Sequence, residues 1–224
     1  MLTTAAIRYE DSLILALDKP AGMPAQADKT GDVSALQWAE SYCELALHPA
    51  HRLDRPASGI LLLAKTKVAM TLLQRQFQEH LIEKEYLAVV AVPPPKPEDT
   101  LIHFLQKNNV KNRAVAHPAE LPDTERAELH YRLLGSSERY HLLHIRLITG
   151  RHHQIRAQLA AIGCPIKGDV KYGARRGNRD RSIHLHAWRL AFEHPGTGEW
   201  MQLEANIPGD DPVWTALRPF LPGS

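Results

Sequence analysis

The chain contains 224 residues, of which 44% are hydrophobic and 23% charged, as in ordinary globular proteins that bury a core. No segment approaches the roughly 20 consecutive apolar residues that span a bilayer, and the first residues lack the basic flank and apolar run of a signal peptide. The two cysteines, Cys43 and Cys164, match no disulfide or metal-site spacing, which fits a reducing compartment. We therefore expect a cytoplasmic protein that makes no membrane contact.

The formal net charge of +2 conceals a strongly basic segment. Between Arg146 and Arg181 there are nine lysines and arginines and two acidic residues, so this segment carries +7 and the rest of the chain −5. Such a distribution predicts a localised surface for a polyanion, with a merely solvated basic face as the alternative. Within the segment, residues 175–181 (RRGNRDR) contain no apolar side chain and predict a basic loop.

The first half of the chain mixes short strands with helices. We expect a strand at 13–17 that ends in a Lys-Pro-x-Gly turn, and a helix that Ser34 caps and that runs to about Leu45. A strand at about 60–65 follows, and then an amphipathic helix at 66–82. A further strand at 85–92 ends at a proline cluster, because proline cannot continue a strand ladder.

The second half reads mainly as paired strands. The polar segment 107–125 predicts an excursion or a partly mobile loop. Segments 126–136 and 140–149 predict two paired strands, and a helix is expected at 152–163, with a glycine as its stop. Residues 184–206 predict a hairpin around a Pro-Gly-Thr-Gly turn.

These elements follow no regular βαβ rhythm, and the sequence contains no repeat and no persuasive domain boundary. The order favours an α+β fold with a central mixed, mostly antiparallel sheet, flanked by helices and loops. We expect residues 1–224 to form a single catalytic domain.

Asp54 is the first candidate for chemistry. It stands in the segment HRLDRPASG, residues 51–59, beside His51, Arg52 and Arg55. Opposite charge nearby lowers the pKa of a carboxyl group, and an ionised carboxylate suits the work of a nucleophile or base. Taken by itself, this local pattern is more typical of a structural salt bridge in a turn.

Arg156 is the second candidate. It lies in TGRHHQIRAQLAAIG, where helical spacing directs its side chain toward the apolar face. A buried arginine needs a carboxylate as its partner, and Asp54 is one that is available. Arg151 would sit at the mouth of the site, while Gln154 and the helix N-terminus could contact a phosphate or a base.

Tyr86 and the histidines complete the candidates. A tyrosine in a strand is usually a core residue, but one that lines a cleft stacks on a base. His184 and His186 share a strand face and could chelate a metal ion, whereas the adjacent His152 and His153 diverge on a helix. Because no third ligand stands at a usual spacing, we expect no metal site.

Four segments, in this order, resemble the RluA-type pseudouridine synthases: HRLDRPASGILLLAKT, KEYLAVV, RLITGRHHQIRAQLAAIGCPIKGDVKYG and IHLHAWRLAFEHP. The opening LDKPAGMPAQ is also similar to that family. The resemblance extends over residues 13–208, and its long central motif is specific.

The resemblance implies a reaction and roles for particular residues. Members of the family isomerise uridine within folded RNA, here ribosomal (23S) or transfer RNA. Asp54 would be the essential aspartate, Tyr86 would contact the flipped uracil, Arg156 would pair with the aspartate, and Arg52 would help to displace the target base. No cofactor and no metal is implied, because the reaction involves no redox step and no group transfer.

The basic segment gains a use from the same resemblance. Electrostatic contacts with the phosphate backbone would position RNA without reading its sequence, and would weaken as salt rises. Besides Arg52, the residues expected to bind substrate are His51, Arg151, Gln154, Lys171, Arg175, Arg176 and Arg179.

The chain departs from the family pattern at two places. Ala57 stands where the family usually has threonine, which removes a turn hydrogen bond at a cost of about 1 kcal/mol at most. The region between VAVPPPKP and HPAELPDTE lacks the usual GxIxxPL pattern, which places the chain in a divergent subgroup and bears on the RNA substrate rather than on the reaction. The sequence also shows no S4-like RNA-binding domain, and we expect a monomer.

Two other functions remain open from the residues. A non-catalytic RNA-binding relative is the main alternative, although the aspartate, tyrosine and arginine are all present. A metal-dependent hydrolase built on the histidines would contain zinc and would be inhibited by chelators.

Overall fold

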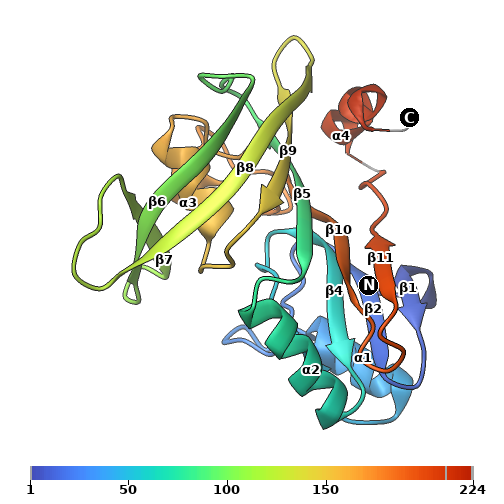
Figure 1. Cartoon of the computed structure of the whole chain (residues 1–224). Coiled ribbons are helices and arrows are strands. Elements are labelled where there is room, and N and C mark those ends of the chain that lie inside the picture. Colours follow the sequence, from blue (N-terminus) through green and yellow to red (C-terminus); the bar gives the residue numbers. More distant parts are fainter. Residues whose placement is uncertain (1, 210, 223–224) are drawn as a thin grey trace. The chain divides into compact units, whose positions relative to one another are not determined.

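A computed structural model describes residues 2–209 and 211–222. The chain divides into two compact units (Figure 1). The first unit comprises Met1–Lys84 and His186–Ile207, and the second comprises Glu85–Leu185 and Pro208–Ser224. The expectation that the whole chain acts as one catalytic domain stays a prediction.

The sheet of the first unit has the strand order β1-β2-β4-β10-β11, with β3 also paired to β4. Only the β4–β10 pair is parallel among the pairings described for this unit. The strands are β1 (Ile7–Glu10), β2 (Ile14–Lys19), β3 (His48–Pro49), β4 (Ser58–Ala64), β10 (Leu185–Glu193) and β11 (Trp200–Glu204). A short 3-10 helix, η1 (Thr4–Ala6), precedes β1.

One helix covers each face of this sheet. Ile60 and Leu62 of β4 share a core with α2 (Lys67–Gln78), while Leu61 and Leu63 share a second core with α1 (Ala35–Cys43). Successive side chains of a strand point to opposite faces, so β4 is apolar throughout because both of its faces are buried.

Both helices of the first unit begin where the sequence predicts. Ser34 and Gln37 form a reciprocal capping box at α1, and the Thr66 side chain accepts a hydrogen bond from the Ala69 amide at α2. Helix α2 ends four residues before the expected end. His80, just beyond it, has a φ of 57°, so the chain leaves the helical path there.

The second unit contains an antiparallel sheet in the order β5-β9-β8-β6-β7. Ala127 on β8 and Leu105 on β6 pack with Ala157 of α3, which covers one face. The elements are β5 (Glu83–Val90), β6 (Glu98–Asn108), β7 (Arg113–His117), β8 (Thr124–Ser136), β9 (His141–Leu147), α3 (Gln154–Ala161), η2 (Val170–Tyr172), α4 (Pro212–Leu217) and η3 (Arg218–Phe220).

The predicted loop at 107–125 is wrong in part. Strand β6 extends to Asn108 and forms a hairpin with β7, in which Lys107 lies opposite Ala114. Ala114 is buried, whereas the polar side chains around it face solvent, so the segment reads as polar although it is a strand. The backbone ladder and the buried Leu105 and Ala114 stabilise this hairpin, and two buried residues do not produce a strong hydrophobic pattern.

The predicted fold class is confirmed. Helices and strands are intermingled, and the sheets are mixed but mostly antiparallel. Among the described residues, no helix is both long and apolar enough to cross a membrane.

Candidate functional site

Asp54 lies in the first unit, in the loop between β3 and β4. Its side chain is half-buried, and the neighbouring Arg52 is exposed. The amide of Ala57 donates to the Asp54 carbonyl at 3.1 Å, which closes a turn immediately before β4. The loop therefore places a carboxylate and an arginine just before β4, the central strand of the sheet in the first unit.

Arg55 has partners that the sequence did not indicate. Its guanidinium contacts Asp28 at 3.0 Å and also binds Thr30 and Asp32. The loop at 28–32 thus holds the Arg55 charge, which the sequence had suggested would act on Asp54. Hydrogen bonds from Thr30, followed by those from Arg55, lower the pKa of Asp28 to about 2.

Lys19 forms hydrogen bonds with the backbone of the Asp54 loop. It is fully buried at the end of β2, and its Nζ donates to the carbonyls of Pro20, Met23 and Ala57 at 2.7–2.9 Å. A fourth carbonyl, that of Arg55, lies 3.4 Å away. Burial lowers the pKa of Lys19 to about 7, and the charge of Asp54 partly opposes this shift. One ammonium group therefore ties the turn that follows β2 to the backbone that follows Asp54.

Lys19 predicts a rise of stability with pH on the alkaline side. In the pH range from about 7 to 10.5 the unfolded chain keeps a proton on Lys19 that the folded chain has lost. The free energy of unfolding therefore rises in this range, by up to about 1.4 kcal/mol per pH unit. Denaturant titrations from pH 6 to 9 should show this rise in the wild type relative to Lys19→Met. Parallel curves for the two proteins would contradict the prediction.

Two neutral histidines anchor the ends of the Asp54 loop. The Nε2 atom of His51 accepts a hydrogen bond from the Leu62 amide at 3.1 Å, and the ring stacks on Phe77. On the other side, Ser58 Oγ lies 2.8 Å from Nδ1 of the buried His186. Burial lowers the pKa of both imidazoles to about 4. The predicted contact between His51 and substrate stays a prediction beside this structural contact.

The loop should therefore be sensitive to acid. The neutral His186 ring contributes its full stability above about pH 6.5, and this contribution is lost as the pH falls toward 4, at up to about 1.4 kcal/mol per unit. We expect His186→Asn to flatten the pH dependence of unfolding between pH 6.5 and 4. Chemical denaturation at closely spaced pH values measures this. A mutant with the wild-type slope would show that the pKa of His186 is the same in the folded and the unfolded chain.

Gly59 allows β4 to approach β10. It has a φ of 113° and lies opposite Ala187 in the parallel pair. A Cβ at this position would clash with the carbonyl oxygen of Ala187. The pair Ser58-Gly59 is thus the point where the loop joins the sheet.

Arg156 lies in the second unit, on α3, with 4% of its surface exposed. Its Nε and Nη2 atoms donate to the two carboxylate oxygens of Asp169 at 2.6 and 2.9 Å. Asp169 is itself 1% exposed. The predicted inward orientation is confirmed, while Asp169 is a partner that the sequence did not suggest. Asp54 belongs to the other unit, so its predicted pairing with Arg156 stays a prediction.

The polar residues at the start of α3 and in the turn before it make internal contacts. The Gln154 side chain is buried, where it accepts from Thr149 and from the Arg151 amide and donates to the Glu128 carbonyl. Arg151 is more exposed and pairs with Glu125 at 2.7 Å. Both side chains therefore shape the turn before the helix, and their predicted contacts with substrate stay predictions.

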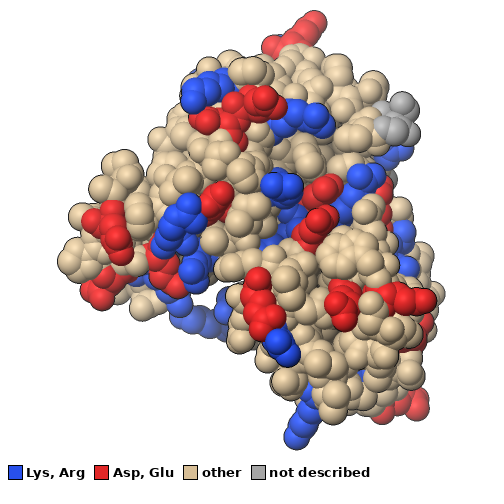
Figure 2. All heavy atoms as spheres, viewed as in Figure 1, with Lys and Arg blue, Asp and Glu red and all other residues tan. Residues whose placement is uncertain are grey.

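The basic loop lies on the surface of the second unit and has a polar anchor. Asn178 bonds to Lys167, Ser182 and His184 and so fixes the middle of the loop. The predicted RNA-binding cations around it, Arg175, Arg176 and Arg179, are exposed. Lys171 is also exposed, and its Nζ donates to the Asn112 carbonyl at 3.2 Å. On the face drawn in Figure 2, basic and acidic side chains are interspersed.

Tyr86 is half-buried on β5, in the second unit. It lies opposite Ile145 of β9, so both belong to one face of that sheet. This face also carries Ala127, which packs with α3, the helix that bears Arg156. Tyr86 and Arg156 thus belong to the same side of the second unit, as their predicted roles require.

The histidines do not group as a metal site would. Among the residues that the structure describes, no three histidine, cysteine or acidic side chains are placed to hold a metal ion. His184 lies 3.1 Å from Asp211 and stacks on Trp214, while His186 contacts Ser58. The two histidines thus have separate structural partners.

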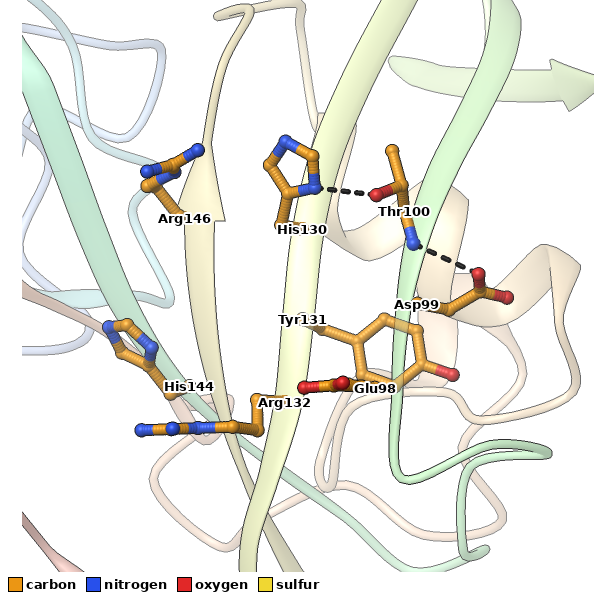
Figure 3. A pocket seen from close by; sticks show the side chains of 8 residues that line it. All are labelled: Glu98, Asp99, Thr100, His130, Tyr131, Arg132, His144 and Arg146. Carbon is orange, nitrogen blue, oxygen red and sulfur yellow. Dashed lines mark hydrogen bonds between the residues drawn. The ribbon is translucent and has the colours of Figure 1, made fainter.

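A depression of about 410 Å³ lies on the sheet of the second unit (Figure 3). Across β8 and β9, His130 lies opposite Arg146 and Arg132 lies opposite His144, so four basic or ionisable side chains line it in two pairs. His130 points away from the face of Ala127, which packs on α3. None of the residues assigned to the site from the sequence lines this depression among the described residues.

Sequence reasoning missed Lys19 and Asp169. Lys19 stands in LDKPAG, where a lysine before a proline reads as an exposed turn residue. From the sequence, Asp169 is only one of the two acidic residues within the basic segment. An acid in a strongly basic segment, 13 residues after a buried arginine, was the available signal for its role.

Comparison with known proteins gives a consistent result. Residues 13–161 match the family model described as RNA pseudouridylate synthase. The "Ribosomal large subunit pseudouridine synthase C" of Vibrio parahaemolyticus is 35% identical over 209 residues, which cover 89% of this chain and 64% of that protein. The "tRNA pseudouridine synthase C" of Salmonella typhimurium is 33% identical over 236 residues, with coverage of 96% and 89%.

An "Uncharacterized RNA pseudouridine synthase" of Chloroflexus aurantiacus is 40% identical over 204 residues. The match covers 86% of this chain but only 63% of that protein, so the chain spans less than two thirds of its length. Among solved structures, "Human RNA Pseudouridylate Synthase Domain Containing 4" has a similar fold, with a TM-score of 0.76, 21% identity, and coverage of 97% and 93%.

Proposed function

Because this chain belongs to the RNA pseudouridylate synthase family, we propose that it isomerises uridine to pseudouridine in structured RNA, either ribosomal (23S) or transfer RNA. The observation that carries the proposal is the Asp54 loop, in which a half-buried carboxylate stands on a turn held by Lys19 and two neutral histidines. A loop that only needed a surface salt bridge would not require this support.

The proposed chemistry begins with removal of the target from its stack. A base within a helix is inaccessible, so the nucleotide must flip out, at a cost of a few kcal/mol. Arg52 is exposed beside Asp54 and would fill the space that the base leaves. Tyr86 would contact the flipped uracil, and stacking on an aromatic ring contributes about 1–3 kcal/mol.

Asp54 would then act at the sugar. It either attacks C1′ or removes a sugar proton, and in both routes the bond between N1 and C1′ breaks. The detached uracil turns and C5 bonds to C1′, as the bond from C1′ to Asp54 breaks in the first route and the sugar regains its proton in the second. C5 then loses its proton to solvent, and N1, which has lost its bond to the sugar, takes up a proton. Atoms and electrons balance within the one nucleotide, so the proposed reaction needs neither a cofactor nor a metal.

Arg156, which lies in the second unit, would pair with Asp54. The exposed cations Arg175, Arg176 and Arg179 would contact the RNA backbone. Because such contacts release counterions, the affinity for RNA should fall as salt rises. We further propose that the enzyme acts as a monomer and in the cytoplasm, where the RNA substrates are folded.

The experiment that tests the function is pseudouridine mapping. Ribosomal and transfer RNA from a strain that lacks the gene would be mapped chemically, with the wild-type gene or the Asp54→Asn gene restored. A site that disappears on deletion and returns only with the wild type would establish the reaction and the substrate together. If every site persists in the deletion strain and the pure protein modifies no RNA transcript, the protein is a non-catalytic RNA-binding relative.

A further inference from the structure

Tyr172 is a buried tyrosine that the proposed reaction does not use. It lies in η2 of the second unit, with 6% of its surface exposed. Two guanidinium groups approach its ring: that of Arg156 lies 5.0 Å and that of Arg113 lies 5.4 Å from the ring centroid. Both distances are within the range of cation–π attraction, so the ring favours the position that Arg156 occupies.

The hydroxyl of Tyr172 joins two other elements. It accepts a hydrogen bond from the Ala114 amide of β7 at 2.7 Å, and it lies 3.0 Å from Nδ1 of His153, the residue before α3. A hydroxyl has one proton, and an amide can only donate. The Tyr172 hydroxyl therefore accepts from Ala114, and the direction of its bond to His153 follows the tautomer of that ring. The single hydroxyl links η2, β7 and the start of α3.

The same short segment carries the counterion of Arg156. Asp169 precedes η2, and its carbonyl accepts from the amides of Tyr172 and Ala174 at 3.0 Å. The Asp169 carboxylate holds the guanidinium of Arg156 at two atoms. Residues 169–172 therefore fix Arg156 from two directions, by charge and by an aromatic ring.

This segment is also tied to the hairpin of β6 and β7. Besides the bond to Ala114, Lys171 donates to the Asn112 carbonyl in the turn of that hairpin. The turn is exposed and includes Val110, which is 96% exposed, and Lys111. A polyanion that binds the turn or Lys171 would therefore act on an element that is hydrogen-bonded to residues 169–172, the segment that holds Arg156.

We propose that Tyr172 is a positioning residue: it fixes Arg156 and couples that arginine to the β6–β7 hairpin, so that RNA docked on the hairpin is held in register with Arg156. The inference rests on the proposed function, in which Arg156 acts at the target uridine. It predicts that the loss of the Tyr172 hydroxyl slows turnover more than it weakens RNA binding.

The test compares Tyr172→Phe with wild type and with Tyr140→Phe. The Tyr140 hydroxyl makes no hydrogen bond among the described residues, so this control makes the same chemical change without breaking a link. The RNA is an in vitro transcript that contains the mapped uridine. In Tyr172→Phe we expect the single-turnover rate constant to fall about threefold to tenfold, as for the loss of a buried hydrogen bond, with the dissociation constant for RNA within about twofold.

A second readout does not depend on activity. The NMR signal of the Arg156 Nε–H, assigned with Arg156→Lys, reports how well the guanidinium is held. Exchange of this proton with solvent should be about threefold to tenfold faster in Tyr172→Phe and unchanged in Tyr140→Phe. Measurements at two temperatures below the unfolding transition ensure that both variants remain folded.

The outcomes separate the two proposals. Wild-type rate and exchange in Tyr172→Phe would overturn the positioning role, and so would a weaker affinity at an unchanged rate, since Tyr172 would then serve only RNA binding. If the wild type converts no uridine in any transcript, the proposed function fails. The exchange of the Arg156 proton still decides in that case whether Tyr172 holds the arginine.

Discussion

Replacing Asp54 by asparagine is expected to abolish pseudouridine formation while the protein still binds RNA. An amide is neither a nucleophile nor a base at the sugar, and loss of a central catalytic group costs on the order of 10⁴-fold or more in rate. The fold should survive, because the backbone carbonyl of residue 54 closes the turn and asparagine keeps that carbonyl. The measurement is a single-turnover assay on the mapped transcript, with the dissociation constant determined in parallel.

The matched control is Asp123→Asn. Asp123 is exposed and has a φ of 61°, a conformation that asparagine adopts as readily as aspartate. This variant makes the same chemical change and should retain wild-type rate and affinity. Substantial turnover by Asp54→Asn would remove Asp54 from the catalytic role, whereas equal losses of turnover and affinity would indicate that it serves RNA binding.

The second large effect is expected at Asp169. Changing Asp169 to asparagine leaves the Arg156 guanidinium buried without the carboxylate that it contacts at two atoms. Removing one partner of a buried ion pair typically costs about 3–5 kcal/mol, because the remaining charge stays out of water. We therefore expect a loss of this size in the free energy of unfolding, measured by denaturant titration with the slope held common to both proteins.

Two further variants identify the cause of that loss. Asp99→Asn removes a carboxylate from an exposed pair with Lys96, and its stability should stay close to that of the wild type. The double mutant Arg156→Met, Asp169→Leu removes both charges and should be more stable than Asp169→Asn alone. If Asp169→Asn is as stable as the wild type, the pair does not stabilise the second unit.

The fold was well predictable where the local pattern and the tertiary environment agree. Strand β4 reads as an unbroken apolar run because α1 and α2 cover its two faces. The helix starts at Ser34 and Thr66 were predictable because the capping residues act through bonds to their own next turn. The hairpin of β6 and β7 was not, because its stability comes from pairing along the backbone, and its side chains are mostly polar.

The sequence by itself determined the family, which the match of residues 13–161 to the family model shows, and it predicted the residues that would carry the chemistry. The tertiary structure alone decided the partners of the buried charges: four carbonyls for Lys19, the loop at 28–32 for Arg55 and Asp169 for Arg156. The physical reason is the range of the interactions. A helix cap or an apolar period acts over a few residues, whereas a buried charge takes the partner that the folded chain places within about 3 Å, however distant in sequence.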